Sequence, residues 1–508
     1  MLRRLRSAAR GALRGWAFSS DGLEAGRSSR RMSGWLPGRD HVNTIIAASG
    51  STALARSRYL VRNNPYAAGA TECFTSNLIG AGIVPNWRND RKADLQALWQ
   101  AWADEADAEH VTDLYGLMRR IGRELFIAGE CFVRRRPRYL TDGLSVPLQL
   151  QILPSEMLPT DLTQDLAGGH RIRQGIEFNA IGKRVAYHFW RVHPGDVTER
   201  TVFGETVRVP AAEILHVFDP VEAGQIRGLP RLTPAIVALW TLDGYDDAEM
   251  ERKRTAALFT AFIKRDDPDG EQFEKAAEEK AKSGDGIATV TLEPGKANVL
   301  FPGEDIAVAA PADVGPNYEA FQYRALTRVC AALSLPYAGV TGDMVRANYS
   351  NQRAALIDVR TRMEALQFGC VVHQFCRPVA KWFLDAAVLG GAIDLEGYVD
   401  APQRYLGIDW IPPKWIWIDP YKDALADIKA IRAGIKTWFE CVSERGRNPQ
   451  DVLAEILAFN QMVDEGKIVL DSDPRKTSNA GLAQDSPEGS KLPAADSPEE
   501  DEERAAAW

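Results

Sequence analysis

The order of apolar and polar positions divides the first part of the chain into helical stretches. Residues 43–80 and 91–128 carry apolar side chains at intervals of three and four, which is the spacing of one helix face. The Asn-Asn-Pro turn at 63–65 predicts a break between two helices in the first stretch. In the second, Trp99 and Trp102 fall on the apolar face, where large rings anchor a core. The folded body is therefore expected to begin with helices.

After Gly129 the apolar period changes to two, which is typical of short strands separated by Gly, Pro and Asp. The predicted strands cover residues 131–133, 148–153, 173–178, 185–190 and 214–218. With the preceding helices these strands predict an α+β block over residues 41–228.

Beyond Gly228 the helical pattern returns. Residues 229–262 are patterned as one helix of roughly 45 Å, at about 1.5 Å per residue. Its middle, residues 243–255, is highly charged and should face water or a neighbouring subunit. A second helix is predicted to begin at Asn317. The residues between the two helices are expected to form a compact module, with strands at 259–263, 287–292 and 297–301 and a helix at 271–282.

Glycine, proline and small polar residues then interrupt the helical pattern at 336–353, which reads PYAGVTGDMVRANYSNQR. This composition indicates a flexible, mixed-charge loop between two long helices. The alternative is an ordinary connection between helices. A third long helical run is predicted over 350–389, interrupted at Pro378, because a proline removes a helix hydrogen bond.

The last ordered part of the chain is expected to be a small helical unit. Strand character returns in the Trp-rich residues 404–418. At 419–420 and 448–449 a capping residue then precedes a proline, which is a start signal for a helix. The helical unit is accordingly predicted over residues 419–470.

Composition and charge exclude a general polycation. The chain has 61 basic and 69 acidic residues, a formal net charge of −8, so any contact with DNA must be local. Its six cysteines are scattered without a C-x-x-C pair, which predicts reduced core thiols of a cytosolic protein rather than a disulfide framework or a zinc site. No run approaches the roughly 20 apolar residues of a membrane span, so a soluble protein without membrane contact is expected.

The two ends of the chain carry opposite charge. Residues 1–40 contain nine arginines and three acids, a net of +6, which indicates a solvated basic arm, a transit peptide, or an arm that binds a negatively charged partner. Residues 471–508 contain ten acids and four bases, a net of −6, and almost no large apolar side chains. We expect this acidic tail to be disordered.

Signatures of catalysis are missing from the sequence. There is no phosphate-binding G-x-x-x-x-G-K-[ST] loop, no H-E-x-x-H and no G-x-S-x-G, and no two of the seven histidines have metal-ligand spacing on a helix. No cofactor or metal is therefore expected. An enzyme stays possible because acid and base groups can come from distant positions. Glu213, His216 and Asp219 of the α+β block are the candidate groups for a hydrolase.

Several strings, in their order and spacing, resemble the lambda-type family of portal proteins of tailed bacteriophages. The strings are RSRYLVRNNPYAAGA, PAAEILHVFDP followed by GQIRGLPRLTPAI, LSLPYAGVTGD with NYSNQR, and PPKWIWIDPYKDALADIKAIRAGI. The resemblance covers about residues 45–465. It implies a ring of usually twelve subunits at one capsid vertex, with a central channel for DNA packaging and ejection and no catalytic activity of its own.

The resemblance implies a predominantly helical α+β fold, that of a portal-type ring subunit with wing, stem, clip and crown regions. These regions would be the wing at 41–228, the first stem helix at 229–260, the clip at 261–312, the second stem helix at 313–335, the tunnel loop at 336–350, a long helix with return strands of the wing at 351–418, and the crown at 419–470. The basic arm at 1–40 and the acidic tail at 471–508 lie outside the resemblance.

The resemblance also implies sites and partners. The tunnel loop would project Val340, Thr341, Asp343, Arg346 and Asn348 toward double-stranded DNA passing through the channel. The clip would dock the packaging motor and connector proteins through Lys264, Arg265, Glu271, Lys275, Glu278 and Lys282. Expected partners are further copies of the chain, the terminase large subunit, head-tail connector or adaptor proteins, and major capsid and scaffolding proteins. The chain would be assembled in the host cytoplasm and reside in the virion. The rival hypotheses are the hydrolase and a monomeric DNA-binding adaptor that uses the basic arm.

Overall fold

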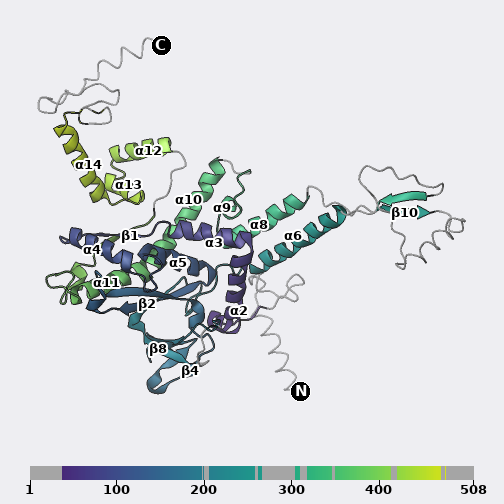
Figure 1. The fold of residues 1–508 in the computed structure, drawn as a ribbon, viewed down its shortest axis with the longest axis horizontal. Helices are drawn as coiled ribbons and strands as arrows, with labels where there is room; N and C mark the ends of the chain where they lie inside the picture. Colours follow the sequence, from purple (N-terminus) through teal and green to yellow (C-terminus); the bar gives the residue numbers. More distant parts are fainter. Residues whose placement is uncertain are drawn as a thin grey trace, which may run out of the picture.

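Helices and small antiparallel sheets build the body of the molecule, and one pair of helices projects away from it (Figure 1). The computed structural model describes residues 37–196, 198, 205–257, 261–265, 304–308, 317–345, 349–413, 420–468, 470 and 475. The helices are α2 (Val42–Asn63), α3 (Pro65–Leu78), α4 (Lys92–Glu105), α5 (Leu114–Ile127), α6 (Ile236–Ala257), α8 (Asn317–Leu333), α9 (Tyr337–Thr341), α10 (Tyr349–Leu366), α11 (Arg377–Leu389), α12 (Pro420–Arg432), α13 (Trp438–Glu444) and α14 (Pro449–Glu465). The mixed, mainly helical α+β character predicted from the sequence is confirmed.

Every strand pair of the described residues is antiparallel apart from one isolated bridge. The strands are β1 (Val84–Trp87), β2 (Glu130–Pro137), β3 (Leu148–Leu153), β4 (Gln164–Asp165), β5 (Arg171–Arg173), β6 (Ile176–Phe178), β7 (Arg184–Trp190), β8 (Thr206–Pro210), β9 (Ile214–Phe218), β10 (Ala261–Arg265), β11 (Glu304–Val308) and β12 (Ile408–Ile411). They form one sheet in the order β3-β2-β9, a second in the order β4-β5-β6-β7-β8, and the pairs β1-β12 and β10-β11.

The main core lies between helices α3, α4, α5 and α11 and the β3-β2-β9 sheet. Trp99 and Trp102 are 1% and 0% exposed, which confirms their predicted role as anchors. The ring of Phe383, from α11, lies 5.0 Å from Trp99 and 5.1 Å from Trp102. A second, smaller core fills the space between the two larger sheets, with Phe132 of β2 against Phe189 of β7 at 5.2 Å. Large aromatic rings thus join segments that are far apart in the sequence.

The predicted break at 63–65 is confirmed, and its cause is a capping residue. α2 ends at Asn63 and α3 begins at Pro65. The side chain of Asn64 accepts a hydrogen bond from the backbone N–H of Ala67, 2.9 Å away. Asn64 therefore caps α3, and the proline at the first position needs no hydrogen-bond partner for its nitrogen.

The prediction of one helix over 229–262 is wrong at its start. α6 begins only at Ile236, because Pro230 and Pro234 lack backbone N–H groups and the segment before α6 forms turns. The backbone N–H of Arg231 instead bonds to the carbonyl of Phe126, 3.1 Å away in α5. Residues 229–235, which were predicted to be the start of the helix, instead connect α6 to the body.

The prediction of one strand over 173–178 is also wrong. β5 and β6 are two strands of a hairpin, joined at Gln174 and Gly175. Both joining residues have positive φ, 52° and 78°, which an extended strand excludes. Strands β1, β4, β8 and β11 have no counterpart in the sequence prediction.

The long helical run ending at Leu389 is continuous through Pro378, where the sequence predicted an interruption. A π-helical segment, Gln367–Cys376, joins α10 to α11 directly. A proline ring collides with the carbonyl of the preceding α-helical turn, and the wider π turn gives it room. The predicted loop at 336–353 also contains helix, since α9 occupies Tyr337–Thr341 and α10 begins at Tyr349.

The module expected between the projecting helices lies mostly outside the described residues. The described part is β10 paired with β11, five residues each. The predicted helix at 271–282 and strands at 287–292 and 297–301 lie outside the described residues, as do residues 414–418 of the predicted strand 404–418. Residues 404–413 of that prediction are described, and of these only 408–411 form a strand, β12.

Candidate functional site

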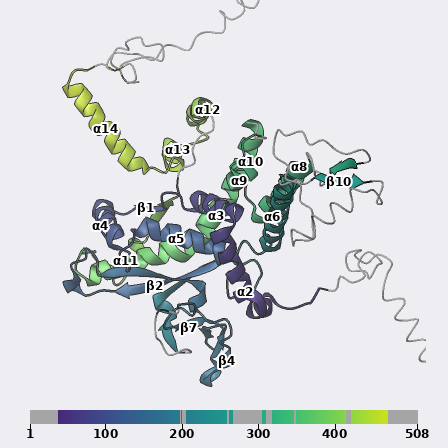
Figure 2. The ribbon, with the colours of Figure 1, turned by 45° about the vertical axis from the view of Figure 1, so that its right-hand side comes forward.

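The projecting pair of helices, α6 and α8, which we call the stalk, is joined by aromatic contacts. Figure 2 shows the two helices side by side outside the body, as in Figure 1. Tyr245 of α6 stacks on Tyr318 of α8 at 6.0 Å and meets Phe321 at 4.8 Å. The Tyr318 hydroxyl donates to Asp246, 3.0 Å away. Burial and this carboxylate raise the pKa of Tyr318 to about 12, so the hydroxyl stays a donor at neutral pH.

The stalk meets the body at a point where two glycines allow the backbones to touch. A Cβ atom on Gly228 would lie 2.4 Å from the carbonyl oxygen of Gly129. A Cβ atom on Gly129 would lie 1.9 Å from the carbonyl oxygen of Leu229, and Gly129 has φ of +79°. Only glycine fits either position. We call the segment from Gln225 to Ala235 the stalk root.

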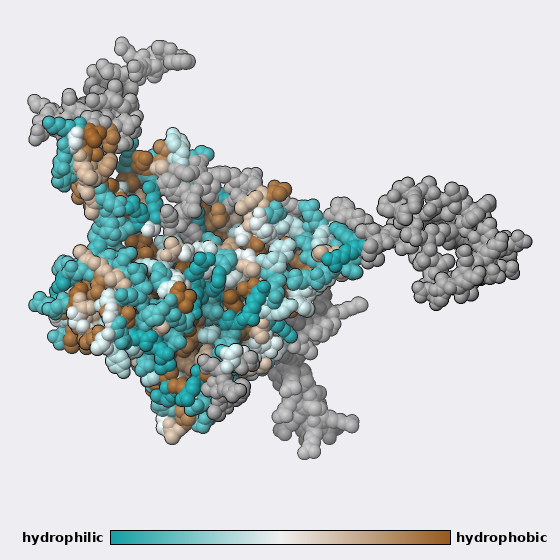
Figure 3. Space-filling view, in the orientation of Figure 1, coloured by the Kyte–Doolittle hydropathy of each residue, from teal (hydrophilic) through white to brown (hydrophobic). Residues whose placement is uncertain are grey.

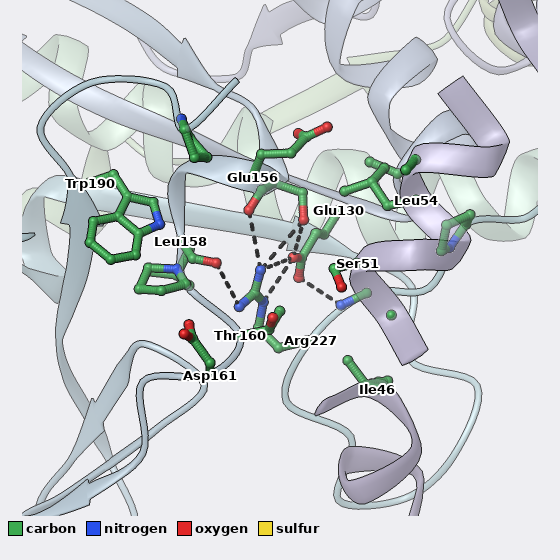
Figure 4. Close-up of a pocket in the computed structure, with 18 residues that line it drawn as sticks. Ile46, Ser51, Leu54, Glu130, Glu156, Leu158, Thr160, Asp161, Trp190 and Arg227 are labelled. Atoms are coloured by element: carbon green, nitrogen blue, oxygen red, sulfur yellow. Dashed lines mark hydrogen bonds and ion pairs between the residues drawn. The ribbon is translucent and has the colours of Figure 1, made fainter. Parts of the chain in front are cut away.

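A buried ionic cluster lies beside this contact (Figure 4). Arg227 of the stalk root and Glu130 of β2 are each 1% exposed. Arg227 Nε donates to Glu130 Oε1 at 2.8 Å, and the Ser155 hydroxyl donates to the same oxygen at 2.6 Å. The other carboxylate oxygen is 2.9 Å from His216 Nε2 and accepts from the backbone N–H of Gly228 at 2.6 Å. Glu130 therefore holds the stalk root to two strands of the central sheet.

The remaining donors of Arg227 are also used inside the protein. Nη1 donates to the carbonyl oxygens of Gln174 and Leu158, at 2.9 and 3.2 Å, and Nη2 donates to the carbonyl oxygen of Ser155 at 3.3 Å. One guanidinium thus ties the stalk root to three chain segments of the body. A buried pair of this kind is costly to break, because the remaining partner becomes an unpaired buried charge.

Burial and pairing set the protonation of the cluster. Burial alone would raise the pKa of Glu130, but the charge of Arg227 and the bond from His216 outweigh it and hold that pKa well below its ordinary value. Burial lowers the pKa of His216 to about 4, against the opposing influence of Glu130. At neutral pH we therefore assign an ionised Glu130 and a neutral His216 that donates through Nε2. Its Nδ1 is buried without a hydrogen-bond partner.

A cavity of about 230 Å³ adjoins the cluster. Ile46 and Leu54 of α2, Trp190 of β7 and the pair Glu130 and Arg227 contribute to its walls (Figure 4). The charged atoms of Glu130 and Arg227 already have hydrogen-bond partners within the protein. They therefore stabilise the cavity wall and leave no free donor or acceptor for a substrate. The cluster is a structural joint.

The three candidate groups for a hydrolase do not converge. His216 is directed to Glu130, as described, and Asp219 accepts from Arg231 at 2.5 Å. Glu213 lies in a short turn before β9. No hydrogen bond or ion pair joins any two of the three described side chains, and none is next to a nucleophile held by a base.

The predicted tunnel-loop residues that the structure describes differ in burial and in their contacts. Val340 is 5% exposed and packs in α9 against α3, where a Cβ on Gly69 would meet its carbonyl oxygen at 2.5 Å. The Thr341 hydroxyl donates to the Tyr337 carbonyl at 2.9 Å. Asp343 is half-buried and accepts from the backbone N–H of Val345 at 2.9 Å. Val340 therefore serves packing within the chain.

Two exposed apolar residues follow shortly after α9, Met344 at 61% and Val345 at 93%. Arg346 and Asn348 lie outside the described residues. Of the predicted docking residues, Lys264 and Arg265 lie on β10, paired in register with Asp305 and Glu304 of β11. The others, Glu271, Lys275, Glu278 and Lys282, lie outside the described residues.

The described residues also bear on the remaining expectations from composition. All six cysteines are free thiols, five of them buried and Cys73 half-buried, as predicted for core positions. Within the ranges that the structure describes, no group of three or more His, Cys, Asp or Glu side chains is placed to hold a metal ion. None of the helices described is both long and apolar enough to cross a membrane.

Sequence reasoning missed the residues of the joint. Glu130 and Arg227 each stand alone among apolar and glycine neighbours, in AGECF and QIRGLP. A single charged residue at the start of an apolar strand, and a second one next to a glycine, are signals of a buried pair. The sequence does not show that these two residues are each other's partner, because 97 positions separate them.

Comparison with known proteins identifies the class. The family model for phage portal proteins of the lambda family matches residues 28–367. The probable portal protein of Halomonas phage phiHAP-1 is 29% identical over 315 residues, which is 60% of this chain and 58% of that relative. Portal protein B of Escherichia phage lambda is 22% identical over 459 residues, 83% of this chain and 85% of the relative. A solved chain from the neck of a native GTA particle matches at 17% identity with a TM-score of 0.44, covering 77% of this chain and 92% of that one.

These matches define a phage portal protein, a structural component of a phage particle. The chain belongs to the lambda family of phage portal proteins. The resemblance noted in the sequence is thereby confirmed.

Proposed function

We propose that this chain is one subunit of a closed ring, with the stalk helices walling an axial channel for double-stranded DNA. Family membership is the observation that carries this proposal. The stalk supports it, since two helices of 22 and 17 residues leave the body as a pair and bury only part of their surface on each other. In a ring, neighbouring copies can cover the rest of the helix surface, because each subunit presents one face to the next copy and another to the previous copy.

Exposed apolar side chains mark where copies meet. On α6, Val237 is 71% exposed and Trp240 60% exposed. They line a groove of about 640 Å³ between α2 and α6, together with Tyr59, whose ring lies 6.2 Å from that of Trp240. A monomeric protein rarely exposes such aromatic side chains together. We assign this groove to contact between subunits.

The joint of Glu130 and Arg227 gives the stalk a fixed direction. A channel wall must keep its orientation relative to the ring body while DNA moves past it. The paired glycines and the fully partnered guanidinium leave the stalk root no alternative packing. The joint would hold the stalk at one angle in every subunit.

The loop after α9 is the segment we assign to the channel surface. Met344 and Val345 are exposed next to Asp343, and Arg346 and Asn348 follow in the sequence. Each phosphate that a cation neutralises strengthens DNA binding. A loop with few charges among apolar groups therefore binds DNA weakly and lets it slide. Rings carrying Asp343→Ala and Arg346→Ala should package or retain DNA less well than the parent. Equal packaging and retention would remove this loop from the channel.

The finer assignments extend the same proposal. The segment between the stalk helices, which includes Lys264 and Arg265 of β10, would dock the terminase large subunit and later the head-tail connector proteins. The α12–α14 unit would be the crown. Twelve copies would complete the ring, with major capsid and scaffolding proteins around it.

Native mass spectrometry of the purified full-length chain tests the proposal. We expect a single closed oligomer of about twelve subunits, with little monomer. A monomer at every concentration, with or without capsid proteins, would contradict it.

A further inference from the structure

Three arginines lie on one face of β2 and its continuation. The sequence reads VRRRPR at 133–138, and alternate residues of a strand point to the same side of a sheet. Arg134, Arg136 and Arg138 therefore share a face, while Arg135 points to the other side and lies over the ring of Trp382 at 5.9 Å. The three side chains are half-buried. Their Cα atoms follow one line at intervals of about 6.7 Å.

These three arginines have no carboxylate partner among the described residues. Cross-strand neighbours are neutral, with Gln149 opposite Arg136, and Gln151 and Ile214 opposite Arg134. Among the described residues, one side-chain hydrogen bond involves the three, from Arg138 Nε to Gln149 Oε1 at 2.7 Å. The Nε of Arg134 is buried with no hydrogen-bond partner. Burial and the adjacent positive charges lower the pKa of Arg136.

Several other arginines of the body do have carboxylate partners. Arg58 bonds to both Glu124 and Glu156, and Arg119 and Arg123 both pair with Glu72. An uncompensated row of like charges costs stability in the folded chain. Such a row is retained where an anion from outside completes it.

We propose that Arg134, Arg136 and Arg138 form a binding site for the sugar-phosphate backbone of double-stranded DNA. A guanidinium binds a phosphate through two parallel N–H bonds. A straight row at strand spacing presents one guanidinium to each of three successive phosphates, which are spaced similarly along a nucleic-acid strand. The site reads no sequence, since phosphate contacts carry none.

This proposal rests on the proposed function, in which the chain meets double-stranded DNA. The arginine row would be a DNA contact outside the stalk and outside the loop after α9. The chain as a whole is acidic, with a net charge of −8, so the arginine row would be a local holding point, apart from the basic arm at 1–40, on a chain whose net charge repels DNA. The competing occupant is the chain's own acidic tail, with five consecutive acids at 499–503.

Salt-dependent binding of the full-length chain to a short DNA duplex tests the site. For the triple variant Arg134→Gln, Arg136→Gln, Arg138→Gln, we expect the slope of log affinity against log salt to become shallower by up to about 2.7, from roughly 0.9 per phosphate contact. The single variant Arg136→Gln should lose about one third of that change. Thermal melting of each variant checks that it folds.

The matched control is Arg119→Gln with Arg123→Gln, which removes two arginines that Glu72 already neutralises. Its slope should stay within about 0.5 of the parent. Equal slopes for the triple variant and the parent, or no DNA binding by the parent, would overturn the proposal. The proposal would also be overturned if the parent chain bound a peptide of residues 496–508 through these arginines and bound no DNA. Native mass of every variant separates these outcomes from a failure of ring assembly.

Discussion

The body and the α12–α14 unit differ sharply in how much they bury. The body encloses a core of many side chains, among them Trp87, Trp99 and Trp102 at 1% exposure or less. In α12–α14 the fully buried side chains among the described residues are Pro449, Cys441, Val442 and Val463. Exposed apolar side chains line α14, visible as brown surface in Figure 3, with Leu457 at 61%, Phe459 at 50% and Met462 at 62%.

This difference separates what the chain stabilises by itself from what it leaves to its neighbours. Burial of apolar surface contributes about 25 cal/mol per Å², so the large core of the body supplies most of the stabilising burial. The α12–α14 unit has too small a core of its own. Its capping box at the start of α13 and its ion pairs, such as Lys436 with Asp427 at 3.0 Å, stabilise the helices without covering their apolar faces. We infer that neighbouring copies cover them.

The largest effect is expected from a cavity in the body. Trp99→Ala removes a ring that contacts four other aromatic side chains of the core and should lower the free energy of unfolding by about 3–5 kcal/mol. Chemical denaturation measures it. The matched control Trp240→Ala removes an exposed tryptophan and should change unfolding by about 1 kcal/mol or less. Similar losses in both variants would abolish the contrast between body and surface.

A comparable effect is expected at the stalk joint. Arg227→Ala leaves Glu130 buried without its cation and should cost about 3–5 kcal/mol. The pKa of Glu130 should then rise, because burial favours the neutral acid. Denaturation at several pH values measures both changes. Arg231→Ala, which breaks the partly exposed pair with Asp219, is the control and should cost about 1 kcal/mol. A loss below 1 kcal/mol for Arg227→Ala would show that the joint is not structural.

The joint also predicts a pH dependence of somewhat smaller size. The pKa of His216 is about 4 in the folded chain and 6.5 as its ordinary value, so the unfolded chain takes up the proton first as the pH falls. Protonation of His216 in the unfolded chain should lower the free energy of unfolding by about 3 kcal/mol as the pH falls from 6.5 to 4. Glu130, whose pKa is depressed, keeps its contribution until the pH drops below its ordinary pKa and then loses it.

His216→Gln keeps a side-chain donor for Glu130 and cannot titrate. The slope of stability against pH between 6.5 and 4 should therefore become shallower in this variant, even where its stability at pH 7 is lower. An unchanged slope would mean that His216 is not the titrating group.

The smallest effect on stability is expected on α14. Leu457→Glu should change the free energy of unfolding by no more than about 0.5 kcal/mol, because the side chain is exposed. It should nevertheless weaken the ring, since a charge would enter an apolar contact between copies. Glu465→Gln on the same helix is the control. Native mass of both variants checks this, and an intact ring with Leu457→Glu would place the subunit contact elsewhere.

The sequence predicted those parts of the fold whose signals are local. The break between α2 and α3, the strands β3 and β9 and the buried Trp99 follow from periodicity and turn chemistry in a few neighbouring residues. The start of α6 was misplaced because apolar spacing continues through Pro230 and Pro234, and the bond from the Arg231 N–H to Phe126 depends on the tertiary structure. Pro378 was misread because the π-helical segment before it has no sequence signal.

The site was less predictable than the fold. Val340 was assigned to a channel surface by its position in a loop, and the structure places it under α3, because the small Gly69 lets α9 approach. The ionic joint depends on residues that meet only after the sheet has formed. Pairings of this kind are properties of the folded chain.

Imaging of the purified full-length chain by cryo-electron microscopy tests the central claim most directly. The account predicts ring-shaped particles with an axial opening, walled by α6 and α8 of every subunit and wide enough for a DNA duplex. Rings whose opening is lined by another part of the body, with the stalk helices on the outside, would contradict it.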